Sequence, residues 1–196
     1  MVLIFEGADL SGKTTIATHY LHSLRVPIVR IRWDLANERV ETLAFAKVTI
    51  GLLTATRANV ILDRSFLSMW AYTREPSDYF DPLVEALRFV PELHVIVLTM
   101  GAEELHRRYE KHPDTSFSEE RLRSVDRRFS ELPARYGRSI DVLHLDTARF
   151  SPPECVTKID AHLGLGSRPI QRGSPVRPRV LEIPIGEIPV GITFPE

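Results

Sequence analysis

Residues 1–20 read MVLIFEGADLSGKTTIATHY, and this stretch decides the fold. The apolar run at 2–5 is typical of a buried strand, and helix-like spacing of apolar residues follows from residue 11. Between them, residues 7–14 match the pattern G-x-x-x-x-G-K-[ST] of a phosphate-binding loop. Because the pattern follows a predicted strand and opens a predicted helix, it predicts a nucleoside triphosphate site. A glycine turn without a ligand is the alternative.

Each residue type in this loop has a physical reason. Gly7 and Gly12 let the backbone curl, so that its N–H groups can surround phosphate oxygens. The following helix directs its positive end to the same point. Lys13 can reach the β and γ phosphates, and the Thr14 hydroxyl can bind Mg²⁺. The predicted nucleotide-binding residues of the loop are Gly7, Ala8, Asp9, Leu10, Ser11, Gly12, Lys13, Thr14 and Thr15.

Strand-like and helix-like segments alternate along the rest of the chain. Short apolar runs predict further strands at 28–31, 60–62, 94–98 and 140–145. Longer segments predict helices at 35–55, 65–73, 81–89, 102–111, 118–135 and 152–163. This alternation predicts an α/β fold in three layers, around a parallel sheet of about five strands. Ligands of such sheets bind beyond the carboxyl ends of the strands.

Composition places the chain among globular proteins. Its 196 residues fit one ordinary domain, 43% of them hydrophobic and 26% charged. A net charge of −1 gives no general argument for nucleic acid or membrane binding. The single cysteine, Cys155, excludes an intrachain disulfide, and we expect a reduced, cytoplasmic location. The sequence predicts neither a signal peptide nor a membrane-spanning helix.

Two further groups of charged residues lie on or directly after predicted elements. Asp63 and Arg64 come directly after the third strand, where an acid can organise Mg²⁺ or accept a proton and an arginine can bind phosphate. An ion pair that fixes the strand end is the alternative. Arg107, Arg108 and the polar loop 112–117 predict a cationic lid that closes on the triphosphate. The alternative is an ordinary charged helix face.

The chain changes character at residue 164. We predict a kinase-like domain at 1–163 and an extended arm rich in proline, glycine and arginine at 164–196. Three interpretations stay open for the arm: packing on its own domain, exchange across a homodimer, or contact with nucleic acid.

Two segments resemble the thymidylate kinase family. Residues 5–15, FEGADLSGKTT, are similar to its loop FEGxDxxGK[ST]T, and residues 63–72, DRSFLSMWAY, resemble its DR[YH]xxSxxAY segment. More weakly, 107–136 is similar in layout to the family lid, and 145–148 to its adenine-side loop. The resemblance covers roughly 1–163 and implies a nucleoside or nucleotide kinase that uses ATP and Mg²⁺.

The resemblance also implies roles for single residues. Lys13 and Thr14 would bind phosphates and metal, and Asp63 would organise Mg²⁺ or act as the base. Asp9 would lie near the acceptor sugar, and Arg64 would hold the acceptor phosphate.

Further residues are placed on the lid, the adenine side or the acceptor side. Arg107 or Arg108 would act from the lid, and Arg149 would lie against adenine. Phe45 would stack on a base, with core packing as the alternative. The predicted acceptor-binding residues are Asp9, Trp33, Phe45, Arg64 and Trp70.

The acceptor region departs from the family pattern. Residues 30–35 read RIRWDL where the family has a REPGG-like turn, and Ser65 replaces the usual aromatic residue or histidine. We predict a pyrimidine deoxynucleoside monophosphate as the acceptor. The alternatives are a hydroxyl acceptor, namely a deoxynucleoside or a hydroxymethylated pyrimidine in DNA, and a nucleotide-binding switch or NTPase that acts with a partner protein. The sequence contains no clear NKxD segment of the kind that recognises GTP.

Overall fold

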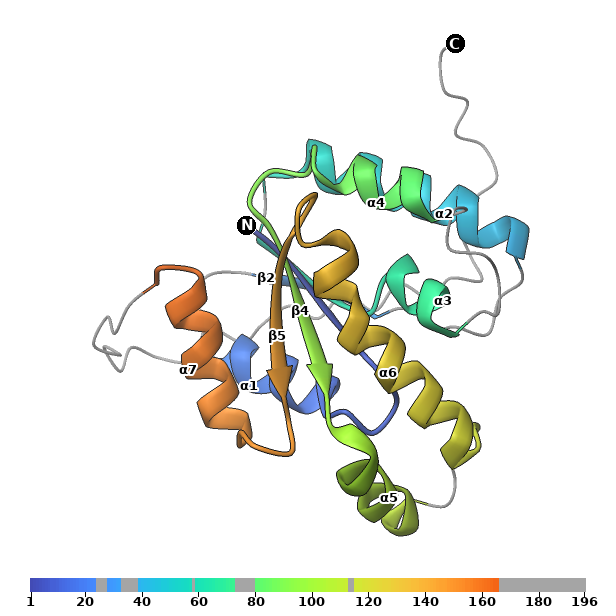
Figure 1. Ribbon diagram of the computed structural model, residues 1–196. Coiled ribbons are helices and arrows are strands. Elements are labelled where there is room, and N and C mark those ends of the chain that lie inside the picture. Colours follow the sequence, from blue (N-terminus) through green and yellow to red (C-terminus); the bar gives the residue numbers. More distant parts are fainter. Residues whose placement is uncertain (24–27, 33–38, 58, 73–79, 113–114, 166–196) are drawn as a thin grey trace.

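The computed structural model describes residues 1–23, 28–32, 39–57, 59–72, 80–112 and 115–165, with the backbone alone at 21–23, 28–32 and 39–45 (Figure 1). Trp33, the start of the predicted helix 35–55, part of the loop 112–117 and the arm from residue 166 lie outside the described residues. The predicted homodimer and DNA contact, which involve that arm, stay predictions.

A parallel sheet of five strands forms the centre of the fold. Its strands are β1 (Val2–Gly7), β2 (Ile28–Arg32), β3 (Asn59–Asp63), β4 (Leu93–Thr99) and β5 (Asp141–Asp146), in the spatial order β2-β3-β1-β4-β5. All four neighbouring pairs are parallel. The predicted α/β class and the five-stranded parallel sheet are therefore confirmed.

Helices connect the strands, close to the predicted positions. They are α1 (Lys13–Ser23), α2 (Arg39–Ala55), α3 (Phe66–Tyr72), α4 (Asp81–Leu87), α5 (Gly101–Lys111), α6 (Glu119–Tyr136) and α7 (Pro152–His162). The ends of α7 follow local chemistry, because Ser151 and Glu154 form a capping box at its start and Gly164 has a left-handed φ of +65° just after it.

The helices cover both faces of the sheet and make three layers (Figure 1). α1 and α7 pack on one face, where Tyr20 and Ile159 belong to one core cluster. α2, α3, α4 and α6 cover the other face, where Phe129 belongs to a larger cluster. Successive residues of a strand point to opposite faces, so Ile4 enters the larger cluster and Phe5 the smaller one.

The helix α6, the second helix of the lid-like layout at 107–136, is a core helix. Its apolar side chains are buried against β1, β4 and β5. Its Asp126 is also buried and accepts hydrogen bonds from the backbone N–H groups of Met100 and Gly101, at the start of α5. The apolar stripe and this bond hold α6 on the sheet, so only α5 and the connection after it remain for a lid.

Among the described residues, no helix combines the length and the apolar character that crossing a lipid bilayer requires.

Candidate nucleotide-binding and phosphoryl-transfer site

The loop after β1 has several positive φ angles, and at its first glycine it leaves no room for a side chain. Gly7 has a φ of +150°, and a Cβ there would lie 2.3 Å from the carbonyl oxygen of Leu98 and 2.7 Å from Ser11 Oγ. Leu10 and Gly12 have φ values of +68° and +83°. These positive φ angles curl the loop between β1 and α1, as a phosphate-binding loop requires.

Lys13, the first residue of α1, is buried within this loop. Its Nζ donates hydrogen bonds to the carbonyl oxygen of Ala8 at 2.5 Å and to Ser11 Oγ at 3.4 Å. Burial, followed by the nearby positive charge of Arg64, lowers the pKa of Lys13 to about 7, although neighbouring carboxylates act in the opposite direction. The side chain is therefore a desolvated amine whose burial outweighs the attraction of the carboxylates around it.

Thr14 and Asp63 meet across the boundary between α1 and β3. The Thr14 hydroxyl donates a hydrogen bond to Asp63 Oδ2 at 2.9 Å. Asp63 is the last residue of β3 and its side chain is buried. A hydroxyl and a carboxylate supply the hard oxygen ligands that suit Mg²⁺, so these two predicted metal-binding residues fit that ion.

Arg64 lies directly after Asp63 in a strained backbone conformation. Its φ is +79°, in the left-handed region that residues other than glycine rarely adopt. Its guanidinium forms an ion pair with Asp9 and lies 5.5 Å from the centre of the Tyr72 ring. The Tyr72 hydroxyl accepts a hydrogen bond from the Asp9 N–H at 2.8 Å. Asp9 and Arg64, both predicted for the acceptor side, are thus brought together.

Glu6 supports the turn that carries Asp63 and Arg64. Its fully buried carboxylate accepts hydrogen bonds from the N–H and the hydroxyl of Ser65 at 2.7 and 2.6 Å, and from the Ser68 hydroxyl at 2.5 Å. The pKa of Glu6 is raised, because burial raises it by more than these hydrogen bonds lower it. We did not single out Glu6 from the sequence, although a glutamate before the loop in FEG was the available signal.

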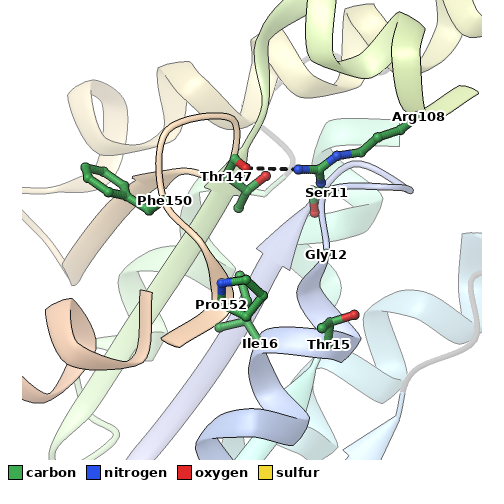
Figure 2. Close-up of a pocket in the computed structure, with 8 residues that line it drawn as sticks. All are labelled: Ser11, Gly12, Thr15, Ile16, Arg108, Thr147, Phe150 and Pro152. Carbon is green, nitrogen blue, oxygen red and sulfur yellow. Dashed lines mark hydrogen bonds between the residues drawn. The ribbon is translucent and has the colours of Figure 1, made fainter. Parts of the chain in front are cut away.

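A cavity of about 200 Å³ adjoins the loop (Figure 2). Ser11 and Gly12 line it from the loop, and Thr15 and Ile16 line it from α1. The remaining lining residues are Arg108, Thr147, Phe150 and Pro152. The cavity thus lies between the phosphate-binding loop and the segment that joins β5 to α7.

Arg108 connects the two walls of this cavity (Figure 2). Its guanidinium donates to the carbonyl oxygen of Leu10 at 2.8 Å and to that of Thr147 at 2.9 Å. Its Nε donates to Glu104 Oε1 at 2.6 Å. Of the two arginines predicted for the lid, Arg108 contacts the loop, whereas Arg107 is 59% exposed and pairs with the same Glu104.

Arg149, which we predicted to lie against adenine, is not among the residues that line the cavity. Its side chain is 78% exposed and pairs with Asp146 at 3.1 Å, one turn earlier. The next residue, Phe150, lines the cavity instead and lies 4.1 Å from the ammonium of Lys158, measured to the ring centre.

The structure describes the side chain of only one of the three remaining predicted acceptor residues. Trp70 is 7% exposed and packs edge-on against Tyr136 with ring centres 5.9 Å apart, so we correct its assignment to core packing. An apolar face of α3 that points toward α6 accounts for this burial. Phe45 belongs to α2, but its side chain and the whole of Trp33 lie outside the described residues.

No family model and no curated protein matches the sequence. The YorR protein from Bacillus subtilis, solved in complex with phosphorylated GDP, is 18% identical, with a TM-score of 0.62 over 84% of this chain and 96% of that one. Deoxyadenosine kinase from M. mycoides with bound dATP is 17% identical, with a TM-score of 0.55 over 84% of this chain and 100% of that one.

These similarities concern the fold. At this identity they do not extend to the substrate, and the narrower resemblance to thymidylate kinases stays a prediction. The structural similarity and the parallel sheet show that the chain shares its α/β fold with YorR and with this deoxyadenosine kinase.

Proposed function

We propose that this chain is an ATP-dependent phosphotransferase that moves the γ-phosphate to a deoxynucleotide, with a pyrimidine deoxynucleoside monophosphate as the first choice. One observation carries the proposal. Buried Lys13 lies in the curled loop, and the Thr14 hydroxyl beside it meets the Asp63 carboxylate at 2.9 Å. These are the cation and the oxygen ligands that a metal-bound triphosphate needs at one place.

In this proposal each residue has a defined task. Mg²⁺, held by Thr14 and Asp63, would neutralise charge on the β and γ phosphates. Lys13 would become fully protonated next to phosphate oxygens, because their charge compensates for its burial. Arg108 would hold the loop and the segment after β5 at a fixed separation, so that ATP enters a cavity of constant width. Positioning and electrostatics then supply most of the rate.

The acceptor side of the proposal rests on Arg64. Its guanidinium lies between Asp9 and Tyr72 at the carboxyl end of β3, and a planar guanidinium can bind a phosphate through two parallel hydrogen bonds. An acceptor phosphate would share Arg64 with Asp9 or displace that carboxylate. Asp9 would then be free to accept a hydrogen bond from the acceptor sugar.

The same ion pair favours a second candidate acceptor. Asp9 already neutralises Arg64, and an uncharged hydroxyl would bind here without competing against a carboxylate. Asp63 would then accept the proton of that hydroxyl as phosphate is transferred. The acceptor would be a deoxynucleoside 5′-hydroxyl or a hydroxymethylated pyrimidine in DNA.

An acceptor screen tests both candidates. Purified protein with Mg²⁺ and γ-labelled ATP is offered deoxynucleoside monophosphates, deoxynucleosides, and DNA with plain or hydroxymethylated pyrimidines. We expect label on the monophosphates, and label on nucleosides or DNA would support the second candidate. Label released only to water would support an NTPase or switch and contradict both. The Lys13→Ala variant is the control, since its loss removes phosphate contacts and should abolish transfer.

A further inference from the structure

A cluster of two histidines and an aspartate lies at the opposite end of the sheet from the phosphate-binding loop. His94 and Asp141 stand near the starts of β4 and β5, where they are direct partners in the parallel register. His162 ends α7, which runs back along the sheet so that its last turn lies where β4 and β5 begin (Figure 1). The three side chains thus come from three separate elements.

Both imidazoles direct a nitrogen at the same carboxylate. His94 Nδ1 lies 2.6 Å from Asp141 Oδ2, and His162 Nε2 lies 3.0 Å from both oxygens of that group. The three candidate ligand atoms all lie within 4.8 Å of one another. The two rings are nearly perpendicular, with centres 6.0 Å apart. The nitrogens and the carboxylate therefore converge on one small volume.

We propose that His94, Asp141 and His162 bind a divalent transition ion, with Zn²⁺ as the best fit. Two imidazole nitrogens and one carboxylate oxygen are a common zinc ligand set. Zinc bonds of about 2.0–2.1 Å place tetrahedral ligand atoms about 3.3 Å apart. The observed separations of 2.6 and 3.0 Å would need to open by about 0.7 and 0.3 Å to reach this spacing, and the two histidine nitrogens already lie within 4.8 Å of each other. Asp141 is 45% exposed, so water can reach the fourth position.

A further histidine of this chain has carboxylate partners whose ligand atoms do not converge on one point. His106 also has two carboxylate partners, but it contacts Glu110 through Nε2 at 3.6 Å and Glu119 through Nδ1 at 3.0 Å. The two nitrogens of one imidazole point away from each other, so these three residues share no centre. In the described part of the chain, the cluster of His94, Asp141 and His162 is the group whose ligand atoms converge.

The proposed ion would fasten the end of α7 to the edge of the sheet. The start of the same helix carries Pro152, which lines the cavity beside the phosphate-binding loop. Because the ion lies at the far end of the strands, it takes no part in phosphate transfer. Its expected effect is on stability, through binding to the folded chain.

The test uses the full chain, treated with a chelator and titrated calorimetrically with Zn²⁺ in a buffer free of phosphate and thiols. We expect one zinc per chain and a higher melting temperature with zinc. His162→Gln and His94→Gln should each weaken binding by at least about 100-fold, more than the loss of an outer partner of a ligand. His106→Gln is the matched control and should bind zinc like the unmodified chain.

Two results would overturn the proposal: no saturable binding by the unmodified chain, or affinities of the two cluster variants equal to that of the control. Anomalous diffraction at the zinc edge, from crystals of the unmodified chain grown with Zn²⁺, does not depend on any variant folding. A peak between the three side chains supports the site, and a peak elsewhere alone contradicts it. Neither measurement depends on the proposed kinase activity.

Discussion

Thr14 and Asp63 are hydrogen-bonded at 2.9 Å although 49 positions separate them in the chain. Thr14 is in the first turn of α1 and Asp63 ends β3, so the contact exists only when β1 and β3 are paired and α1 has started at the right residue. The pair therefore links the correct folding of the sheet to the assembly of the proposed metal site.

Asp63→Asn tests the metal role. The amide keeps the size of the side chain but removes its charge, so we expect kcat to fall by about 10²–10⁴-fold and the required Mg²⁺ concentration to rise. ATP binding without Mg²⁺ should change little. Magnesium titrations of activity and metal-free nucleotide binding measure the two effects. Thr14→Ser, which keeps the hydroxyl, is the control, and a loss equal to that of Asp63→Asn would contradict the assignment.

Nucleotide binding should draw a proton onto Lys13. Its pKa is lowered to about 7 in the folded chain, and bound phosphates would return it toward the ordinary value. At pH 8 the complex should therefore take up about one proton. Calorimetry in buffers of different ionisation enthalpy counts that proton. Lys13→Met should show no uptake, and equal uptake by both proteins would remove Lys13 as its source.

The same shift predicts how stability depends on pH without nucleotide. Between about pH 7 and the ordinary pKa of 10.5, the unfolded chain holds a proton on Lys13 that the folded chain has released. The contribution of Lys13 to the free energy of unfolding must therefore rise with pH across this window. Denaturant unfolding at several pH values, compared with Lys13→Met, isolates the contribution. A steeper rise in the variant would contradict it.

Gly7→Ala should damage the fold and nucleotide binding together. The new Cβ would lie 2.3 Å from a backbone oxygen at a φ of +150°, and overpacking of this kind costs about 1–3 kcal/mol. Gly51→Ala is the matched control, because a Cβ at this exposed position in α2 has nothing within 4 Å and should stabilise the helix by about 0.5–1 kcal/mol. Denaturant unfolding should give shifts of opposite sign.

Glu6→Ala should lower activity through the position of the turn after β3. The change leaves the buried N–H of Ser65 without its acceptor, at about 1–3 kcal/mol of stability. We expect kcat to fall while ATP affinity, which depends on the loop and the cavity, changes less. Glu6→Asp retains a carboxylate and should recover part of the loss. No difference between the two variants would mean that the carboxylate does not position the turn.

Arg108→Lys should raise KM for ATP, because an ammonium cannot reproduce the fork that joins Leu10 to Thr147. Arg107→Lys changes an exposed ion pair and should have a smaller effect. Steady-state kinetics with varied ATP measures both variants. A larger loss at Arg107 would reverse the assignment of the two arginines.

Local features of the sequence predicted most of the fold. Apolar runs such as the one in 94–98 are short and typical of buried strands, so the strands were found close to their observed limits. The loop at 7–14 could be predicted because its pattern of glycines, lysine and threonine lies within eight consecutive residues. Contacts between residues far apart in the sequence were not predictable. The bonds of Arg108 to two carbonyl oxygens and the burial of Trp70 against α6 depend on how α5, α3 and α6 pack.

The strand order places β1 in the middle of the sheet, with β3 and β2 on one side and β4 and β5 on the other. Under the proposed function, the acceptor is bound on the β3 side and ATP lies in the cavity on the β4 and β5 side. The two sides share the loop after β1 and the metal ligand Asp63, which ends β3. Substitutions on the acceptor half that spare Asp63 can then accumulate during evolution without disturbing the donor half. On this proposal the acceptor can diversify separately from ATP, and grafting the β2–β3 half of a relative onto this chain, with Asp63 kept, would be a direct way to redesign its specificity.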